Sequence, residues 1–294
     1  MKKKHYFGRG AMFVLCAIFA IAFLLPTVLT ITNSFMSEEE INANYGMIFS
    51  TTTGGYVSKT VNLKFIPDKV TLSQYINGLI KSPEYLLKFW NSVLLVVPIV
   101  IFQVAIASVA AYSFTRWRGK IRSGIFFFYV ILMLMPYQVT LVPNYLVSKW
   151  LGILNTSWAI ILPGVFAPFS VFLLTKFMRR IPYSLIEAAK VDGATAWQTF
   201  WKVKIPNLMP TITICLFLSI TNGFKLFDQN LALTGGAPAH STEMLALNIY
   251  NTFYSRAGIA WQGIGQAKAV IFCILVVAIS MIQLKATRSK EVQQ

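Results

Sequence analysis

The chain has 294 residues, of which 56% are hydrophobic and only 12% are charged, and its formal net charge is +16. Ordinary soluble domains carry about 25% charged residues, so this composition excludes a typical water-soluble protein and indicates a polytopic membrane protein. The positive charge does not indicate nucleic-acid binding, because most of the 26 Lys and Arg lie between apolar segments, as the positive-inside rule expects. We therefore expect no nucleic-acid partner.

Six apolar segments predict six transmembrane helices, and the 22 residues of the first are long enough to cross the ~30 Å of hydrocarbon at ~1.5 Å per residue. The predicted spans are 11–32, 93–112, 125–146, 158–174 with extensions at both ends, 211–233 and 267–284. Pro136 and Pro143 break the third of them, and such breaks are tolerated in lipid where the freed backbone lines a cavity or packs on protein. The distribution of basic residues places both termini in the cytoplasm.

These spans divide the chain into four parts. They are 1–32, the N-terminus and first span; 33–90, an extracytoplasmic segment; 91–286, a core of five spans; and 287–294, a cytoplasmic tail. Thr51–Gly55 of the second part is a predicted turn region. Residues 71–88 have apolar side chains at helical spacing, which predicts either a helix on the outer membrane surface or one packed on the bundle.

The sequence predicts no chemistry of its own. Cys16, Cys215 and Cys273 lie inside apolar runs, where cysteine is typically a small packing residue, and His5 and His240 are far apart, so no metal site is expected. The pattern G-x-x-x-x-G-K-[ST] is absent, so the chain is not expected to bind ATP itself. We expect neither a catalytic residue nor a cofactor in this chain.

The basic loop at 181–210, between the fourth and fifth spans, is the most informative stretch. Ser184 and Glu187 have capping-box spacing, which predicts a helix that begins at Ser184. Gly193 is expected to end that helix in the left-handed conformation. A second amphipathic helix is predicted over 196–204, ending before Pro206 because the residue before a proline disfavours helix.

This loop resembles the EAA motif of the membrane permease subunits of bacterial ABC importers. The resemblance is carried by Glu187-Ala188-Ala189, by Gly193, and by Val203-Lys204-Ile205-Pro206, where the usual ending is I-x-L-P. Neighbouring residues, Ile181-Pro182 and Asp192-Gly193-Ala194, resemble the carbohydrate-uptake branch with its maltose-type permeases. The resemblance covers about 86–290.

The resemblance implies an all-α membrane protein with six transmembrane helices, the type I ABC importer permease fold, and a cytoplasmic coupling helix that docks on a separate ATPase subunit. The residues implied in this coupling are Glu187, Ala188, Ala189, Asp192, Gly193 and Pro206. The implied partners are a second permease subunit, two cytoplasmic ATPase subunits that carry ATP and magnesium, and an extracytoplasmic solute-binding protein, which the 33–90 segment could touch.

A candidate substrate path lies in the polar half of the fifth span. If that helix is straight, Asn222, Lys225 and Gln229 share one face, and Lys225 lies deep in the bilayer, where ionisable groups usually face a cavity. Asp228 could pair with Lys225, so a structural ion pair is an alternative, as is a lysine that reaches outward to the membrane surface. The path candidates are Asn222, Lys225, Phe227, Asp228 and Gln229.

The sequence therefore predicts a permease subunit, in a bacterial plasma membrane, of an ATP-driven and binding-protein-dependent importer of a sugar, with an oligosaccharide favoured. An ABC permease for another organic solute is the first alternative. An ion-driven secondary transporter is less favoured, because the spans hold one candidate carboxylate, Asp228, and no inverted repeat is evident. A membrane protein that serves only assembly is the third alternative.

Overall fold

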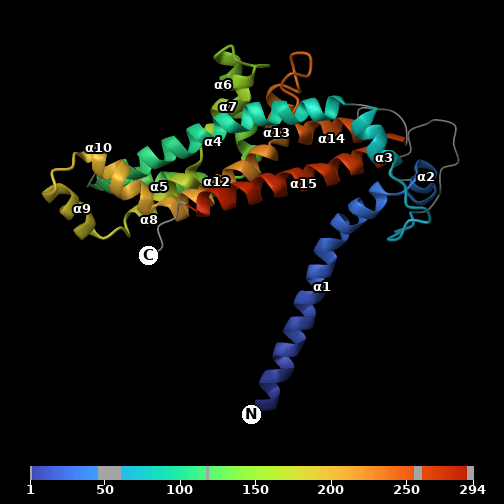
Figure 1. The fold of residues 1–294 in the computed structure, drawn as a ribbon, viewed down its shortest axis with the longest axis horizontal. Helices are drawn as coiled ribbons and strands as arrows, with labels where there is room; N and C mark the ends of the chain where they lie inside the picture. Colours follow the sequence, from blue (N-terminus) through green and yellow to red (C-terminus); the bar gives the residue numbers. More distant parts are fainter. Residues whose placement is uncertain (1, 46–60, 82, 117–118, 255–259, 290–294) are drawn as a thin grey trace. The chain divides into compact units, whose positions relative to one another are not determined.

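The computed structural model describes residues 2–45, 61–81, 83–116, 119–254 and 260–289, and all the regular elements in these ranges are helices (Figure 1). The chain separates into two compact units. The first comprises Met1–Leu86 and Asn248–Cys273, and the second comprises Leu87–Leu247 and Ile274–Gln294. The predicted turn at Thr51–Gly55 lies outside the described residues.

The first unit is built around the end of the long helix α1. Its elements are α1 (Lys2–Ser34), α2 (Glu38–Tyr45), α3 (Ser73–Tyr75), the π-helical turn η1 (Ile76–Ile80), α14 (Leu245–Tyr254) and the first half of α15 (Ala260–Arg288). Met36, Ile41 and Tyr45 form a small buried cluster. Lys268 is buried in this unit and donates hydrogen bonds of 2.9 Å to Asn248 and Thr252, which joins α15 to α14.

The helix predicted over 71–88 is two helices. Ile80 ends the first, and the spanning helix α4 (Glu84–Arg116) already begins at Glu84. The first of the two packs on its unit through Gln74 and Gly78, which are buried, whereas Leu72, Ile76 and Ile80 are exposed. The face that packs on the unit therefore contains a small and a polar residue, and these three apolar side chains lie on the exposed face.

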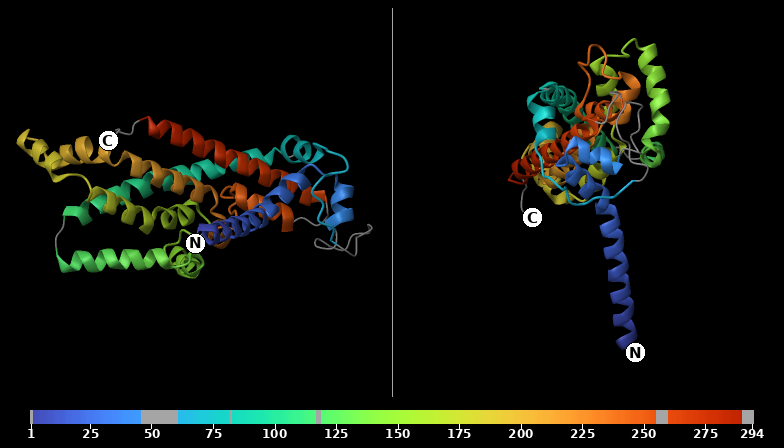
Figure 2. Two further views of the ribbon diagram at one scale, coloured as in Figure 1. Left: turned by 90° about the horizontal axis from the view of Figure 1, so that it is seen from below. Right: turned by 90° about the vertical axis from the view of Figure 1, so that its right-hand side faces the viewer.

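The second unit contains the rest of the chain's helices. They are α4, α5 (Lys120–Leu134), α6 (Tyr137–Trp150), α7 (Ser157–Val165), α8 (Pro168–Met178), α9 (Tyr183–Val191), α10 (Ala196–Thr199), the π-helical turn η2 (Phe200–Lys204), α11 (Ile205–Asn207), α12 (Met209–Phe224), α13 (Phe227–Leu233) and the second half of α15. Figures 1 and 2 both show α9 and α10 beyond the ends of α5 and α8, at one end of this unit.

Four helical segments of the described chain are long and apolar enough to cross a membrane: Met12–Ser34, Glu84–Arg116, Ser157–Met178 and Trp261–Arg288. Two bent pairs raise the number to six if each pair counts as one span. The multi-pass prediction is thus confirmed, although three of the six predicted spans, 125–146, 158–174 and 211–233, are each divided into two helices. The stretch between the predicted fifth and sixth spans also contains a helix, α14, that the sequence pattern did not indicate.

The predicted spans 125–146 and 211–233 are both broken. In the first, α5 and α6 meet at 106°, at Pro136, while Pro143 lies inside α6 without interrupting it. In the second, α12 ends at Phe224 and Leu226 leaves helical geometry with φ −67 and ψ 72. The proline explains the first break because it has no N–H for the helix ladder. The second break has no proline, which is why the sequence pattern missed it.

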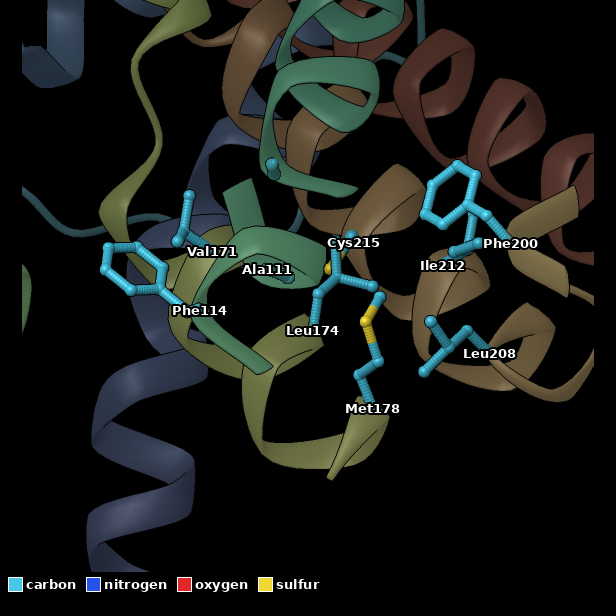
Figure 3. Close-up of a cluster of buried hydrophobic side chains, with 10 residues drawn as sticks. Ala111, Phe114, Val171, Leu174, Met178, Phe200, Leu208, Ile212 and Cys215 are labelled. Atoms are coloured by element: carbon cyan, nitrogen blue, oxygen red, sulfur yellow. The ribbon is translucent and has the colours of Figure 1, made fainter. Parts of the chain in front are cut away.

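The core of the second unit lies where α4, α8 and α12 meet the 181–210 loop. Leu174 of α8 and Cys215 of α12 are completely buried there, beside Ala111 of α4 (Figure 3). Phe200 and Leu208 of the loop join the same cluster. The loop is therefore anchored in the core of the spanning helices.

Two glycines allow other helices to pack closely against the N-terminal half of α4. A Cβ at Gly223 of α12 would lie 2.8 Å from a Val96 methyl group, and one at Gly164 of α7 would lie 2.9 Å from Ile99. Val96 and Ile99 are one helical turn apart on α4, and both are buried. Small residues commonly permit such approaches between membrane helices.

We predict that Gly223→Ala destabilises the protein, although alanine favours helix over glycine by about 1 kcal/mol. The added methyl group meets a branched side chain that has little rotamer freedom, and overpacking typically costs about 1–3 kcal/mol. The melting temperature of the detergent-solubilised protein should fall by several degrees, and the double variant Gly223→Ala, Val96→Ala should recover most of the loss. A melting temperature that rises with Gly223→Ala alone would contradict the close packing.

Candidate functional site: the 181–210 loop and the cavity

The first helix of the 181–210 loop is shaped by its C-terminus. Gly193 has φ +75 and ends α9, as predicted. The N–H of Gly193 donates to the carbonyl of Lys190 at 3.0 Å, and the N–H of Ala194 donates to Ala189 at 2.9 Å. These two bonds form a Schellman motif, in which a glycine avoids the Cβ penalty of the left-handed conformation. The chain reversal after Asp192 is therefore fixed by hydrogen bonds.

The predicted capping box at the other end of α9 is wrong. The helix begins at Tyr183 with Pro182 as its N-cap, and no side chain caps it. The capping box of the loop lies at α10 instead, where the N–H of Thr195 donates to the Gln198 side chain at 2.8 Å and the N–H of Gln198 donates to the Thr195 hydroxyl at 3.2 Å. Both pairs have the same spacing, so the spacing alone did not distinguish them.

The predicted stop before Pro206 is also wrong, because the second helix continues from Ala196 to Asn207. The five residues before Ile205 form the π-helical turn η2. A π turn shifts the hydrogen-bond pattern by one residue, and Pro206 then sits in the first turn of α11, where its missing N–H leaves no ladder bond unmade.

Aromatic and cationic side chains fix this second helix to α4. Phe200 lies edge-to-face against Tyr112, with ring centroids 5.0 Å apart. The buried ammonium of Lys204 lies 4.6 Å from the centroid of the same Tyr112 ring. Burial lowers the pKa of Lys204 in this loop, and the charge of Arg116 lowers it further. The second helix is thus held against α4 by buried contacts.

The outer side of the loop is apolar and uncovered. Val191 has a relative exposure of 84% and Trp197 one of 68%, and Tyr183 is exposed as well. Glu187, Ala188 and the other coupling candidates at α9 are exposed or half-buried, and Pro206 is half-buried near the end of the second helix. Apolar groups at this exposure make this side of the loop a candidate contact surface.

A cavity of about 730 Å³ lies inside the second unit. Helix breaks line it on three sides, at Met135 between α5 and α6, at Phe166 and Ala167 between α7 and α8, and at Leu226 between α12 and α13. Broken helices at membrane depth are tolerated where the freed backbone lines such a space. The position of the cavity therefore follows from the breaks.

The side chains around the cavity are amides, hydroxyls and apolar groups, and no Asp, Glu, Lys, Arg or His is among the described residues that line it. Its polar lining residues are Gln103, Tyr137, Thr140, Asn144, Ser170, Ser219, Asn222 and Gln229. The Gln103 Oε1 atom is buried and has no hydrogen-bond partner among the described residues, and Asn222 is exposed to the cavity. The amide of Asn222 is therefore open to a polar ligand.

The break at Lys225 corrects the predicted substrate face. Asn222 and Gln229 line the cavity from two different helices, while Lys225 is exposed and is not part of the lining. No ion pair joins Lys225 to Asp228 in the described structure. Phe227 and Asp228 are half-buried at the start of α13 and do not line the cavity either.

Gln229 differs from Asn222 because both ends of its side chain are engaged. It donates to the carbonyl of Ile160 at 2.7 Å and accepts the Tyr137 hydroxyl at 2.6 Å. Gln229 is therefore a fixed part of the wall. The sequence analysis missed the contributions of α4 to α8, such as Gln103 and Tyr137, although the proline breaks had indicated that backbone there could line a cavity.

The sequence also matches known proteins. The family model described as "Binding-protein-dependent transport system inner membrane component" matches residues 103–287, more than half of the chain. The probable starch degradation products transport system permease protein AmyD of Thermoanaerobacterium thermosulfurigenes is 42% identical over 144 residues, which are 49% of this chain and 46% of that protein. The chain thus spans about half the length of the first curated relatives it matches.

Two further matches extend over more of the chain. The trehalose/maltose transport system permease protein MalF of Thermococcus litoralis is 27% identical over 271 residues, covering 79% of this chain and 85% of that protein. The crystal structure of a bacterial ABC transporter involved in the import of the acidic polysaccharide alginate has a chain with the same fold, with a TM-score of 0.75, 20% identity, and coverage of 97% of this chain and 98% of that one. By its family match and its fold, this chain belongs to the inner membrane components of binding-protein-dependent transport systems.

Proposed function

We propose that this chain is a membrane-spanning permease subunit of an ATP-driven, binding-protein-dependent sugar importer, with an oligosaccharide as the favoured cargo. The family match over 103–287 carries the proposal. The relatives AmyD and MalF are named as permease proteins for starch degradation products and for trehalose and maltose, which supports a carbohydrate cargo. The chain performs no bond chemistry in this scheme.

The exposed side of the 181–210 loop is the proposed contact with a cytoplasmic ATPase subunit. Glu187, Ala188, Ala189, Asp192 and Gly193 lie on or beside α9, and the exposed Val191 and Trp197 supply apolar area for such a contact. Closure of the ATPases on ATP moves the loop, and the buried contacts of Phe200 and Lys204 pass the motion to α4. In this arrangement both termini are cytoplasmic.

The cavity is the proposed half of the translocation path that this chain contributes. Its amide and hydroxyl groups suit sugar hydroxyls, and Phe166 and Phe169 offer apolar surface for the C–H faces of a sugar ring. A second permease subunit supplies the other half, and an extracytoplasmic solute-binding protein delivers the cargo. The structure of an alginate ABC transporter with its periplasmic protein supports such a set of partners for this fold.

Reconstitution tests this function. The chain, co-expressed with its partner permease and ATPase subunits and placed in proteoliposomes, should import a labelled oligosaccharide only when ATP and the binding protein are present. Uptake that follows an imposed proton gradient without the ATPase subunits would favour an ion-driven transporter. Uptake of a different organic solute with ATP would keep the transporter class and change the cargo.

We predict that Gly193→Val lowers uptake at least tenfold while membrane abundance stays within twofold. A β-branched residue disfavours the left-handed conformation that Gly193 holds, whereas its Cβ would meet no other atom within 4 Å, so backbone conformation alone is changed. Gly193→Asn is the matched control, because asparagine tolerates this conformation, and it should retain most of the uptake. Equal uptake by the valine and wild-type proteins would contradict coupling through this turn.

We also predict that Asn222→Ala raises the apparent KM of uptake about tenfold with little change in abundance. Its amide is exposed to the cavity and could bind a sugar hydroxyl directly. Thr221→Ala is the control, since Thr221 is the neighbouring residue on α12, lies outside the lining and, within the described structure, bonds only to its own helix. Lys225→Ala should change the KM less than Asn222→Ala does, and the reverse order would overturn the assignment of the cavity.

A further inference from the structure

Two adjacent side chains of α13 are buried and serve different parts of the second unit. Gln229 binds Ile160 and Tyr137 at the cavity wall. Asn230, which is 0% exposed, turns to the following loop, which we call the 234–244 loop. This loop is the orange segment that rises beside α6 and α7 in Figure 1.

Asn230 closes the 234–244 loop across its base. Its Nδ2 donates to the Thr234 hydroxyl and to the carbonyl of Thr242, both at 2.9 Å. Its Oδ1 accepts the N–H of Met244 at 3.0 Å. One side chain therefore joins the start and the end of the loop, and all its hydrogen-bonding groups are used.

The far side of the loop is held by the start of α4. The carbonyl of His240 accepts from Lys88 and from Asn91, each at 3.1 Å. Ala239 and His240 both have positive φ, of 46 and 60, and such conformations persist where the surroundings fix them. Glu243 is buried and forms an ion pair of 3.3 Å with Lys88. The loop thus has one shape, although its tip around His240 is exposed.

We infer that Asn230 is a positioning residue that fixes the 234–244 loop and, through the adjacent Gln229, ties the position of the loop to the wall of the cavity. The inference rests on the proposed function, in which the solute-binding protein docks on the extracytoplasmic side and delivers cargo to this cavity. A force on the loop reaches Gln229 through the rigid helix α13. Delivery of cargo and the shape of the receiving cavity are then coupled.

The first measurement uses the wild-type protein in its full complex. Hydrogen exchange should be slow at the N–H groups of Met244 and Leu245, which are bound by the side chains of Asn230 and Ser92. Their protection should approach that of the helix interior of α4. Rapid exchange at both positions would overturn the inference without any variant, because the loop would then have no fixed shape.

The second measurement compares Asn230→Ala with Ser92→Ala. Each removes the acceptor of one of two neighbouring amides, but only Asn230 adjoins Gln229. Exchange should accelerate across the 234–244 loop in both variants, whereas exchange in the cavity-lining segment 137–144 should accelerate only in Asn230→Ala. Asn230→Asp keeps the acceptor for the N–H of Met244 and removes the side-chain donor. It replaces Asn230→Ala in the comparison if the alanine variant does not assemble.

The functional measurement is the stimulation of ATP hydrolysis by sugar-loaded binding protein. Asn230→Ala should raise the half-maximal concentration of the binding protein about tenfold, the size expected for the loss of one or two ordering hydrogen bonds, and basal hydrolysis should stay within twofold. Thr221→Ala is again the control, because in the described structure that side chain bonds within its own helix. The apparent KM for sugar should rise in Asn230→Ala and stay unchanged in Ser92→Ala.

Two results from the variants would also overturn the inference. One is equal behaviour of Asn230→Ala and Ser92→Ala at the cavity segment and in the KM, which would make Asn230 a purely local brace. The other is faster exchange of the loop with unchanged stimulation. Failure of the wild-type complex to respond to any binding protein would instead refute the proposed function, and the exchange results for Asn230 would still stand.

Discussion

Lipid cannot hydrogen-bond to a peptide group, and this constraint decides where the helices of this protein can end. A polar backbone group left unbonded in hydrocarbon costs several kcal/mol, so a helix may break at membrane depth only beside protein or water. The breaks at Met135, at Phe166 and at Leu226 all border the same cavity. The cavity and the broken helices are therefore one feature, and each accounts for the other.

A single continuous helix, α4, connects the parts of the second unit. Near one end Tyr112 binds the second helix of the 181–210 loop, and near the other Asn91 binds the 234–244 loop. The two residues are ~31 Å apart along an ideal helix at ~1.5 Å per residue. Between them, Gln103 lines the cavity and Val96 packs on Gly223. The two loops and the wall of the cavity are therefore joined by the same helix.

The sequence predicted what periodicity and composition encode and missed what tertiary packing decides. The apolar runs and the left-handed Gly193 were predicted because each depends on local residues. The capping box at Ser184 was wrong because α9 already begins at Tyr183 with Pro182 as its N-cap, which places Ser184 inside the helix. The sequence between Asn222 and Gln229 contains no proline, so nothing in it indicated the helix break at Lys225. Because of that break, Asn222, Lys225 and Gln229 do not share one helix face as predicted.

The two sides of the 181–210 loop also differ in what holds them. Local hydrogen bonds at Gly193 and Thr195 shape the exposed turn of the loop. Its inner side is held by the contacts of Phe200 and Lys204 with Tyr112, so that side cannot move away from α4 without breaking a buried contact. Its outer side presents Val191 and Trp197 to the surroundings. A loop that is stiff toward its own helices and apolar toward its surroundings transmits a push instead of absorbing it. On the proposed function, this stiffness lets an ATPase outside the membrane change the cavity within it.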